Sequence, residues 1–235
     1  MRLIVTRPEP DASATAELLR ARGHAVDVVP LLRVETVVGA DLGAGPWGGI
    51  VITSANATRA IAAHPRMREL VGRPVFAVGR RSAEAARAVG FAHVASADGD
   101  ARDLVRLVAA RADRNVPLLY LAGEDRAADL ESELAAHGVA LATVVVYRAL
   151  AEPSLPPAIR AALAAGAIDG VLHYSRRSAD TFVACAAAAR IDLKSLKTKH
   201  YCASAEVAGA FRQAGVDAVA TAVHPDQAAL FALIV

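Results

Sequence analysis

The sequence predicts an α/β fold with two similar parallel-sheet domains, each with helices on both faces, joined by a two-stranded linker. Two observations indicate this. Short runs rich in Val and Ile alternate with Ala-, Leu- and Arg-rich segments of helical period, which is typical of parallel sheets covered by helices. Several strand-to-helix corners also occur twice. The expected strands are 3–5, 26–32, 50–53, 75–78, 116–121, 139–147, 170–174, 199–203 and 216–220, and the expected helices are 11–22, 56–64, 82–89, 101–112, 126–136, 157–165, 178–188, 205–213 and 225–234.

The duplicated corners indicate two copies of one strand-turn-helix unit. VITSANATRA (51–60) and VLHYSRRSADTF (171–182) each pass from an apolar run through a serine into a helical pattern. VGRRSAEAARAVG (78–90) resembles ASAEVAGAFRQAG (203–215), and each ends in a glycine suited to the positive φ that follows many helices. A looser third pair matches residues 3–30 with residues 119–147.

The copies do not occur in the same order along the chain, which predicts a discontinuous domain. The third pair is followed in each copy by an unusually long apolar strand, 26–38 and 139–150. We therefore expect one domain from residues 1–35 plus 149–235, a second from 36–148, and hinge strands near 30–38 and 144–150. The alternative is a single domain whose alanine-rich helices resemble one another by chance.

Composition excludes several classes of protein. The chain has 235 residues, is 54% hydrophobic, and has a formal charge of +2, which is too small to indicate nucleic-acid binding. Alanine accounts for much of the apolar content, and no apolar run reaches the about 18 residues that a membrane-spanning helix needs. The start, MRLIVTRPEP, is apolar for only four residues, so we expect a first strand and no signal peptide.

The cysteines argue against a metal site. Cys185 and Cys202 are the only two, they form no CxxC pair, and His200 and Cys202 should point to opposite faces of a strand. We expect no metal, no cofactor, no nucleic-acid or membrane partner, and a cytoplasmic location. The chain also has no P-loop, no GxGxxG after a strand and no GxSxG motif.

The corners lie where an open parallel sheet binds ligands, outside the carboxyl ends of its strands. They contain residues of helix-capping type, for which capping alone is the alternative role: Ser54, Asn56, Ser82, Ser175, Ser178 and Ser204. Arginines also gather near these ends: Arg7, Arg59, Arg80, Arg81, Arg126, Arg176 and Arg177. Guanidinium groups and helix N-termini together suit a ligand with several negative charges, the alternative being an ordinary solvated surface.

The motifs, in order and spacing, resemble those of uroporphyrinogen-III synthases over essentially the whole chain. They are VTRP (5–8), VITSANA (51–57), AVGRRSA (77–83), LAGEDR (121–126), VVVYRA (144–149), LHYSRRSA (172–179) and DQAAL (226–230). The resemblance implies two α/β domains on a two-stranded linker. It also implies a cofactor-independent lyase that closes hydroxymethylbilane to uroporphyrinogen III, with loss of water and inversion of ring D.

The same resemblance implies roles for individual residues. Tyr147 would assist departure of the hydroxyl group, the alternative being a residue that packs the linker. Carboxylates of the substrate would be bound by the corners and their arginines; the expected substrate-binding residues are Thr6, Arg7, Ser54, Asn56, Gly79, Ser82, Gly123, Arg126, Ser175, Ser178 and Ser204. The chain departs from the family at 204–207, where Ser-Ala-Glu-Val replaces the usual Gly-x-x-Thr.

Two other functions fit the same features. One is a non-enzymatic two-domain hinge protein that binds a small polyanion, and the other is a synthase-like domain without activity. The resemblance implies hydroxymethylbilane as the small-molecule partner and the preceding enzyme, hydroxymethylbilane synthase, as a candidate protein partner. We expect a monomer, since nothing in the sequence requires a dimer.

Overall fold

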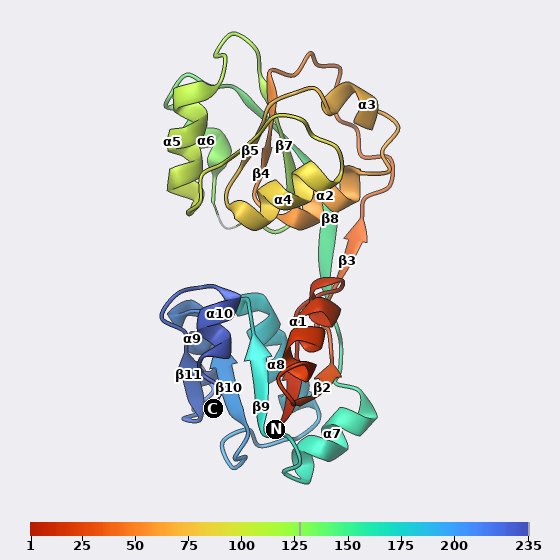
Figure 1. The fold of residues 1–235 in the computed structure, drawn as a ribbon, viewed down its shortest axis with the longest axis vertical. Helices are drawn as coiled ribbons and strands as arrows, with labels where there is room; N and C mark the ends of the chain where they lie inside the picture. The colour runs from red at the N-terminus through yellow and green to blue at the C-terminus, as the bar shows by residue number, and fades with distance from the viewer. Residues whose placement is uncertain (127, 235) are drawn as a thin grey trace. The chain divides into compact units, whose positions relative to one another are not determined.

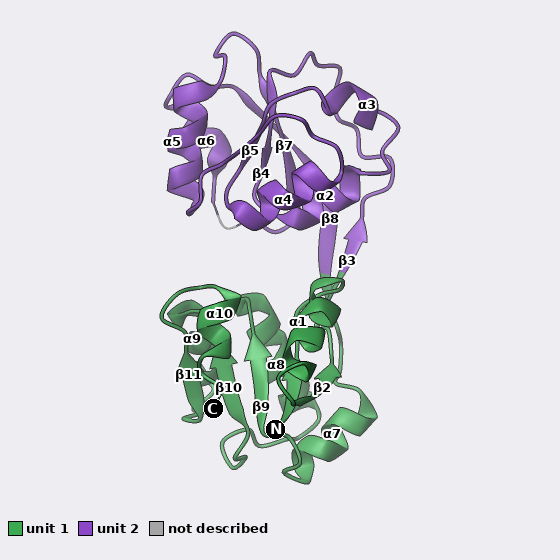
Figure 2. Cartoon of the chain, viewed as in Figure 1, with its two compact units in different colours: residues 1–33, 150–235 green, residues 34–149 purple. Residues whose placement is uncertain are grey.

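The computed structural model describes residues 1–126 and 128–234. Within it the chain divides into two compact units (Figure 2). Unit 1 consists of residues 1–33 and 150–235, and unit 2 of residues 34–149. Each unit has its own sheet, with one hydrophobic core cluster on each face of it.

Unit 1 has a five-stranded parallel sheet in the order β11-β10-β9-β1-β2 (Figure 1). Its strands are β1 (Arg2–Val5), β2 (Ala25–Val28), β9 (Gly170–His173), β10 (Lys199–Cys202) and β11 (Val219–Thr221). Its helices are α1 (Asp11–Arg20), α7 (Pro157–Ala164), α8 (Arg176–Ala188), α9 (Ala205–Gln213) and α10 (Gln227–Phe231). Ile4 packs with Phe182 and Phe211 of α8 and α9, whereas Leu3 packs with Leu19 and Leu230 of α1 and α10. Neighbouring residues of β1 therefore face two separate cores, as a sheet covered on both faces requires.

Unit 2 has a six-stranded sheet in the order β3-β8-β7-β4-β5-β6. Its strands are β3 (Leu32–Thr36), β4 (Gly49–Ile52), β5 (Val75–Ala77), β6 (Val94–Ser96), β7 (Leu118–Gly123) and β8 (Leu141–Ala151). Its helices are α2 (Ala55–Ile61), α3 (Met67–Leu70), α4 (Arg80–Ala88), α5 (Ala101–Arg111) and α6 (Leu130–Ala135). Leu119 packs on the side of α2 and α4, and Tyr120 on the side of α5 and α6. The fold class predicted from the sequence is confirmed by these two parallel-dominated sheets.

The strands β3 and β8 extend across the unit boundaries and run antiparallel. The amide of Val37 donates to the carbonyl of Val146 at 2.9 Å, and the amide of Glu152 donates to the carbonyl of Leu31 at 3.0 Å. As residue numbers rise on one strand they fall on the other, which defines the antiparallel direction. The main chain therefore connects the two units through this pair of strands.

The two sheets have the same strand order once the repeated segments are matched. By the sequence pairs, β4, β5, β7 and β8 correspond to β9, β10, β1 and β2, and β6 and β11 each follow the paired helices α4 and α9. Read from its β6 edge and without β3, the sheet of unit 2 has the order β6-β5-β4-β7-β8. When each strand is replaced by its counterpart, this becomes β11-β10-β9-β1-β2, the order found in unit 1. The different order of the repeats along the chain is thus a difference in connection, not in the arrangement of the strands.

Some element boundaries differ from the prediction. The long strand expected at 26–38 is divided into β2 and β3, and Pro30, which has no amide N–H to donate, lies in the gap. The helix expected at 126–136 begins at Leu130, because Asp129 accepts the amide of Ser132 and caps it; residue 127 lies outside the described residues. Strand β6 and helix α3 were not predicted. No helix among the described residues is long and apolar enough to span a membrane.

Candidate functional site

Each sheet has a point where the direction of its connections reverses. In unit 1 the chain proceeds from β1 outward to β2, and from β9 in the opposite direction to β10 and β11, so the reversal lies between β1 and β9. In unit 2 it lies between β4 and β7. Open α/β sheets bind ligands at the carboxyl ends of the strands beside such a reversal. The predicted corners at Thr6, Ser54, Gly123 and Ser175 lie at the carboxyl ends of these four strands.

In unit 1 the corner after β1 fixes an arginine in place. Arg7 is 9% exposed, and its Nη1 donates to Thr15 Oγ1 at 3.1 Å and to Gln227 Oε1 at 3.3 Å. Its guanidinium also lies over the ring of Tyr174, 4.2 Å from the centroid, which joins the β1 corner to the β9 corner. Asp11 lies 3.7 Å from Arg7 Nη2 and partly offsets its charge.

Thr6 lies beneath this corner and is fully buried. Its hydroxyl donates to the carbonyl oxygen of Leu172 at 2.8 Å, which ties the end of β1 to β9. The hydroxyl is therefore used inside the protein, and a substrate role for Thr6 stays a prediction.

The corner after β9 is a capped helix start. Ser175 Oγ accepts the amide of Ser178 at 3.2 Å, and the two hydroxyl oxygens lie 2.9 Å apart. Ser175 is exposed and Ser178 is buried, so only the first presents its side chain to solvent. Arg176 is held elsewhere: its Nε pairs with Asp180 at 2.9 Å, and its Nη2 donates to Gln213 at 2.6 Å.

In unit 2 the corner after β4 is capped in the same way. Ser54 Oγ accepts the amide of Asn56 at 3.1 Å, and Asn56 Oδ1 accepts a hydrogen bond from Arg59 at 3.0 Å. One residue earlier, Thr53 Oγ1 and Tyr120 Oη form a hydrogen bond of 2.8 Å that joins β4 to β7. Burial raises the pKa of Tyr120, although the Thr53 hydrogen bond acts in the opposite direction, so the phenol stays protonated near neutral pH.

The corner after β5 lacks a capping side chain. Gly79 occupies the N-cap of α4, which is nine residues long and has no side-chain cap hydrogen bond among the described residues. A Cβ at Gly79 would meet no atom within 4 Å, so the main chain is open at this point. Ser82, in the first turn, is 6% exposed. With no side-chain cap at Gly79, the start of α4 can donate main-chain N–H groups to an acceptor from outside the protein.

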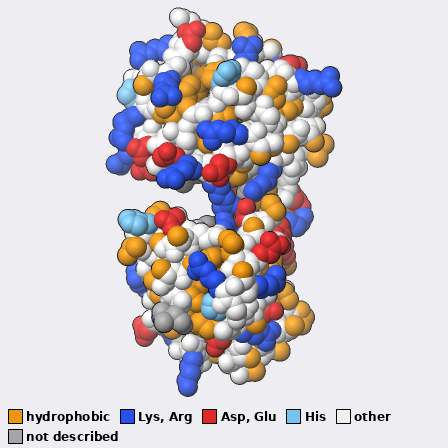
Figure 3. Space-filling model, viewed as in Figure 1, with side chains coloured by type: hydrophobic (Ala, Val, Ile, Leu, Met, Phe, Trp, Pro, Cys, Tyr) orange, Lys and Arg blue, Asp and Glu red, His pale blue; other side chains and the backbone are white. Residues whose placement is uncertain are grey.

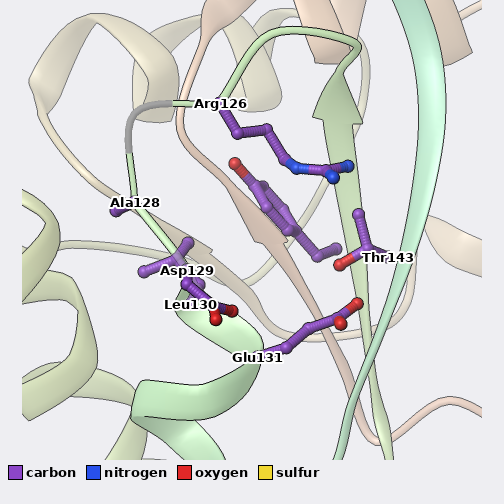
Figure 4. Close-up of a pocket in the computed structure, with 7 residues that line it drawn as sticks. Arg126, Ala128, Asp129, Leu130, Glu131 and Thr143 are labelled. Atoms are coloured by element: carbon purple, nitrogen blue, oxygen red, sulfur yellow. The ribbon is translucent and has the colours of Figure 1, made fainter.

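The end of β7 brings a glycine, a tyrosine and an arginine together. Gly123 pairs with Tyr147 of β8, across a register shift in the ladder, and the tyrosine ring lies against the glycine main chain. Arg126 follows three residues later and lines an open pocket of about 260 Å³. The other lining residues are Tyr120, Ala128, Asp129, Leu130, Glu131 and Thr143. Figure 4 shows the side chains of Arg126 and Glu131 both extending toward Thr143.

These contacts define which predicted residues lie together. Thr6, Arg7 and Ser175 lie at the reversal of unit 1, and Ser54, Gly123 and Arg126 at that of unit 2, while Tyr147 joins the second group through Gly123. Gly79 and Ser204 lie at the ends of the adjacent strands β5 and β10. On the face shown in Figure 3, basic and acidic side chains are interspersed over each unit. Within residues 1–126 and 128–234, no group of three or more His, Cys, Asp or Glu side chains could hold a metal ion.

Comparison with known families identifies the chain. The sequence model described as uroporphyrinogen-III synthase HemD matches residues 13–232. The chain belongs to the uroporphyrinogen-III synthase family. No curated protein sequence gives a significant match.

Solved synthase structures share the fold. The uroporphyrinogen-III synthetase from Helicobacter pylori 26695 superposes with a TM-score of 0.68 at 18% identity, covering 99% of this chain and 98% of that one. A mutant uroporphyrinogen III synthase from the extremely thermophilic bacterium Thermus thermophilus gives a TM-score of 0.57, also at 18% identity, covering 99% and 97%. At this identity the likeness concerns the fold alone.

The departure from the synthase pattern at 204–207 has a structural explanation. Ser204 caps α9, since its Oγ accepts the amide of Val207 at 3.3 Å. Val207 is 4% exposed and packs in the core with the residues of α8. The hydroxyl of this corner thus lies at the N-cap of α9 and not in its first turn. Glu206 is exposed in the first turn, where a negative charge interacts favourably with the helix dipole.

A buried histidine pair that the sequence did not indicate lies behind the unit 1 corner. His173 Nδ1 lies 3.5 Å from Thr6 Oγ1, and His173 Nε2 lies 3.2 Å from His200 Nδ1. Both rings are fully buried beside Phe182 and Phe211. Burial lowers the pKa of His200 to about 4 and that of His173 well below its usual value, so both are neutral at pH 7. The sequence does show one histidine in each of two apolar strands, His173 and His200. It could not show that these two strands are neighbours in the sheet.

Proposed function

We propose that this chain catalyses the closure of hydroxymethylbilane to uroporphyrinogen III with inversion of ring D and loss of water. The observation that carries the proposal is the match of the synthase family over residues 13–232. The two sheet reversals, each beside hydroxyl groups and an arginine, provide the chemistry that a polycarboxylate needs.

We propose that the substrate's eight carboxylates bind at the corners of both units. Three groups can each bind one carboxylate of the substrate: the exposed Ser175, the uncapped first turn of α4 at Gly79, and the guanidinium of Arg126. Arg7 supplies positive charge from a position that its partners hold fixed. The net charge of +2 is compatible with this mode of binding, because local donors and not the overall field hold each acid group.

The first chemical step is loss of the hydroxyl group from ring A. Protonation of this group lets it leave as water, and the pyrrole nitrogen lone pair stabilises the resulting azafulvenium cation. Tyr147 is proposed to donate its phenolic hydrogen bond to the departing oxygen. Its position on β8 is fixed by the contact with Gly123.

Ring inversion follows from where the cation is attacked. The substituted carbon of ring D forms the new bond, and the resulting spiro-pyrrolenine breaks the bond that joined ring D to ring C. The fragments then reclose with ring D reversed and with loss of the ring proton. In water the free position of ring D reacts instead and gives the type I isomer. The protein therefore acts mainly by holding the folded chain in one reactive arrangement.

Several further properties belong to this proposal. We propose that the two units are two structural domains of a monomer, that the protein acts in the cytoplasm, and that it binds no nucleic acid. The preceding enzyme, hydroxymethylbilane synthase, is the protein partner expected to supply the unstable substrate. No cofactor is required by the steps above.

The test is an isomer analysis with freshly prepared hydroxymethylbilane. The products are oxidised to porphyrins and separated, with a parallel reaction that lacks the protein. Predominant type III product is expected, at a rate above the uncatalysed closure. Type I product formed at the uncatalysed rate would contradict the proposed activity.

A further inference from the structure

Three charged side chains line the pocket beside Tyr120: the Arg126 guanidinium and the carboxylates of Asp129 and Glu131. Among the described residues, neither the Arg126 guanidinium nor the Glu131 carboxylate has a hydrogen-bond or ion-pair partner, and both side chains line the pocket. Asp129 differs, because its two oxygens accept the amide and the hydroxyl of Ser132 at 3.1 and 2.7 Å. The pocket thus offers one cation, which also interacts electrostatically with Asp129, and one carboxylate, that of Glu131, without a partner among the described residues.

The walls add two hydroxyl groups and an aromatic surface. Tyr120 is 4% exposed, and its hydrogen bond to Thr53 fixes the direction of its phenol. Thr143 lies directly opposite Tyr120 in the ladder of β7 and β8. Tyr120 and Thr143 belong to the paired strands β7 and β8, so this wall of the pocket is part of the sheet.

The size and charges restrict the ligand. A pure anion would be repelled by Glu131, and a pure cation by Arg126. A ligand with both an acid group and an N–H donor satisfies both side chains. The volume of about 260 Å³ falls just below the about 300–1,000 Å³ of whole-ligand pockets, which fits one ring of a larger ligand.

We propose that this pocket is a subsite for a single pyrrole ring of the substrate, with a carboxylate arm on Arg126 and the ring N–H directed at Glu131. The inference rests on the proposed synthase activity for its substrate. Tyr120 forms the face against which the ring packs and donates to the same carboxylate arm. Glu131 thereby distinguishes a pyrrole from a simple polyacid.

The test measures binding of a monopyrrole that carries one acetate and one propionate arm, by protein NMR titration. Arg126→Gln and Glu131→Gln are each expected to weaken binding about tenfold, as for the loss of a hydrogen bond to a charged group. Glu133→Gln on the same helix and Arg111→Gln on α5 are the controls, since neither residue lines the pocket. Both controls should bind as the unaltered protein does.

Whether Glu131→Gln weakens or strengthens binding of the monopyrrole tests the proposed role of Glu131. If the pocket only collected acid groups, removal of the Glu131 charge would strengthen binding, and that result would overturn the proposal. An N-methyl monopyrrole should lose more affinity for the unaltered protein than for Glu131→Gln, whose neutral amide oxygen is a weaker acceptor of the ring N–H. Absence of saturable binding of the monopyrrole to the unaltered protein also overturns the proposal.

The same variants separate this inference from the proposed activity. If the unaltered protein forms type III product while Arg126→Gln and Glu131→Gln keep its KM, the activity stands and the subsite is wrong. If the unaltered protein forms only type I product, the activity is wrong, and the titration still tests the pocket. Urea unfolding of each variant confirms that it is folded.

Discussion

The ring of Tyr147 lies directly against the main chain of Gly123, so that a Cβ atom at position 123 would come within 2.6 Å of the tyrosine Cζ and 2.8 Å of its Oη. The amide of Glu124 also donates to the carbonyl of Tyr147 at 3.1 Å. The glycine is thus explained by close packing, since any larger residue would displace the proposed proton donor. The prediction that Gly123 itself contacts substrate is a separate matter that this contact does not test.

Substitution Gly123→Ala should therefore impair catalysis by moving Tyr147. The added methyl group requires a shift of the ring or of β7, and overpacking of this kind costs about 1–3 kcal/mol in the free energy of unfolding. We expect kcat to fall about tenfold or more, with a smaller change in KM. Steady-state kinetics and urea unfolding measure the two effects.

The matched control is Gly72→Ala, in the same unit. A Cβ at Gly72 would meet no atom within 4 Å, and this glycine has no positive φ. Its kcat and unfolding free energy should stay close to those of the unaltered protein. If Gly123→Ala behaved as Gly72→Ala does, the packing of Tyr147 would have no part in the reaction.

Removal of the phenolic hydroxyl tests the role of Tyr147 itself. Tyr147→Phe keeps the ring against Gly123 but removes the hydrogen bond proposed for the departing hydroxyl. We expect turnover to slow about tenfold or more, which corresponds to about 1.4 kcal/mol in the barrier. The product should remain type III, because the fold of the bound substrate is unchanged. A rate within about a factor of two of the unaltered protein would remove Tyr147 from the mechanism.

The sequence was sufficient to predict the fold class because its repeats are local. A buried strand followed by a serine and a helical pattern appears at Ser54 and again at Ser175, and each serine does cap a helix. Two features of the sheets were not predicted: the three-residue strand β6, and the division at Pro30 of the long strand expected at 26–38. Strand β5 is equally short but was predicted, because Val75 and Phe76 form a visible apolar run, whereas Val94 is the only large apolar residue of β6.

The candidate site was only partly predictable. Residues at strand ends could be named from spacing, such as Arg126 after β7. Contacts across strands could not, because register depends on tertiary packing. Tyr120 was therefore missed, although it pairs with Thr53 and lines the pocket of Arg126. In the same way, the sequence did not indicate that Arg176 pairs with Asp180.

Threonine should not be tolerated well in place of Val207. Val207→Thr puts a hydroxyl into the core of unit 1 without adding apolar volume, and burial of a poorly satisfied hydroxyl costs about 1–3 kcal/mol. We expect lower stability in urea and an unchanged KM, because Ser204 already supplies the capping oxygen. Val223→Thr is the control, since that side chain is 83% exposed. A lower KM for Val207→Thr would show instead that the hydroxyl reaches the substrate.

The buried pair of His173 and His200 predicts that unit 1 loses stability in mild acid. Burial lowers the pKa of His200 from 6.5 to about 4, and burial together with the charge on His200 lowers that of His173. The unfolded chain therefore binds more protons than the folded chain between about pH 6.5 and 4. Stability is fully present above pH 6.5 and falls as the pH drops through this range. At pH 4 the titration of His200 lowers the free energy of unfolding by on the order of 3 kcal/mol, because each unit of pKa difference corresponds to about 1.4 kcal/mol.

Urea unfolding at several pH values between about 7.5 and 4.5 measures this dependence. His200→Phe should make the dependence shallower, because an aromatic ring without a titrating group then stacks on Phe211, whose centroid lies 4.1 Å from that of His200. Some pH dependence should remain from His173. The control, His224→Phe, replaces an exposed histidine and should leave the slope as it is. An equal slope in His200→Phe and the unaltered protein would mean that His200 does not titrate on unfolding, and that other groups govern the acid sensitivity of the fold.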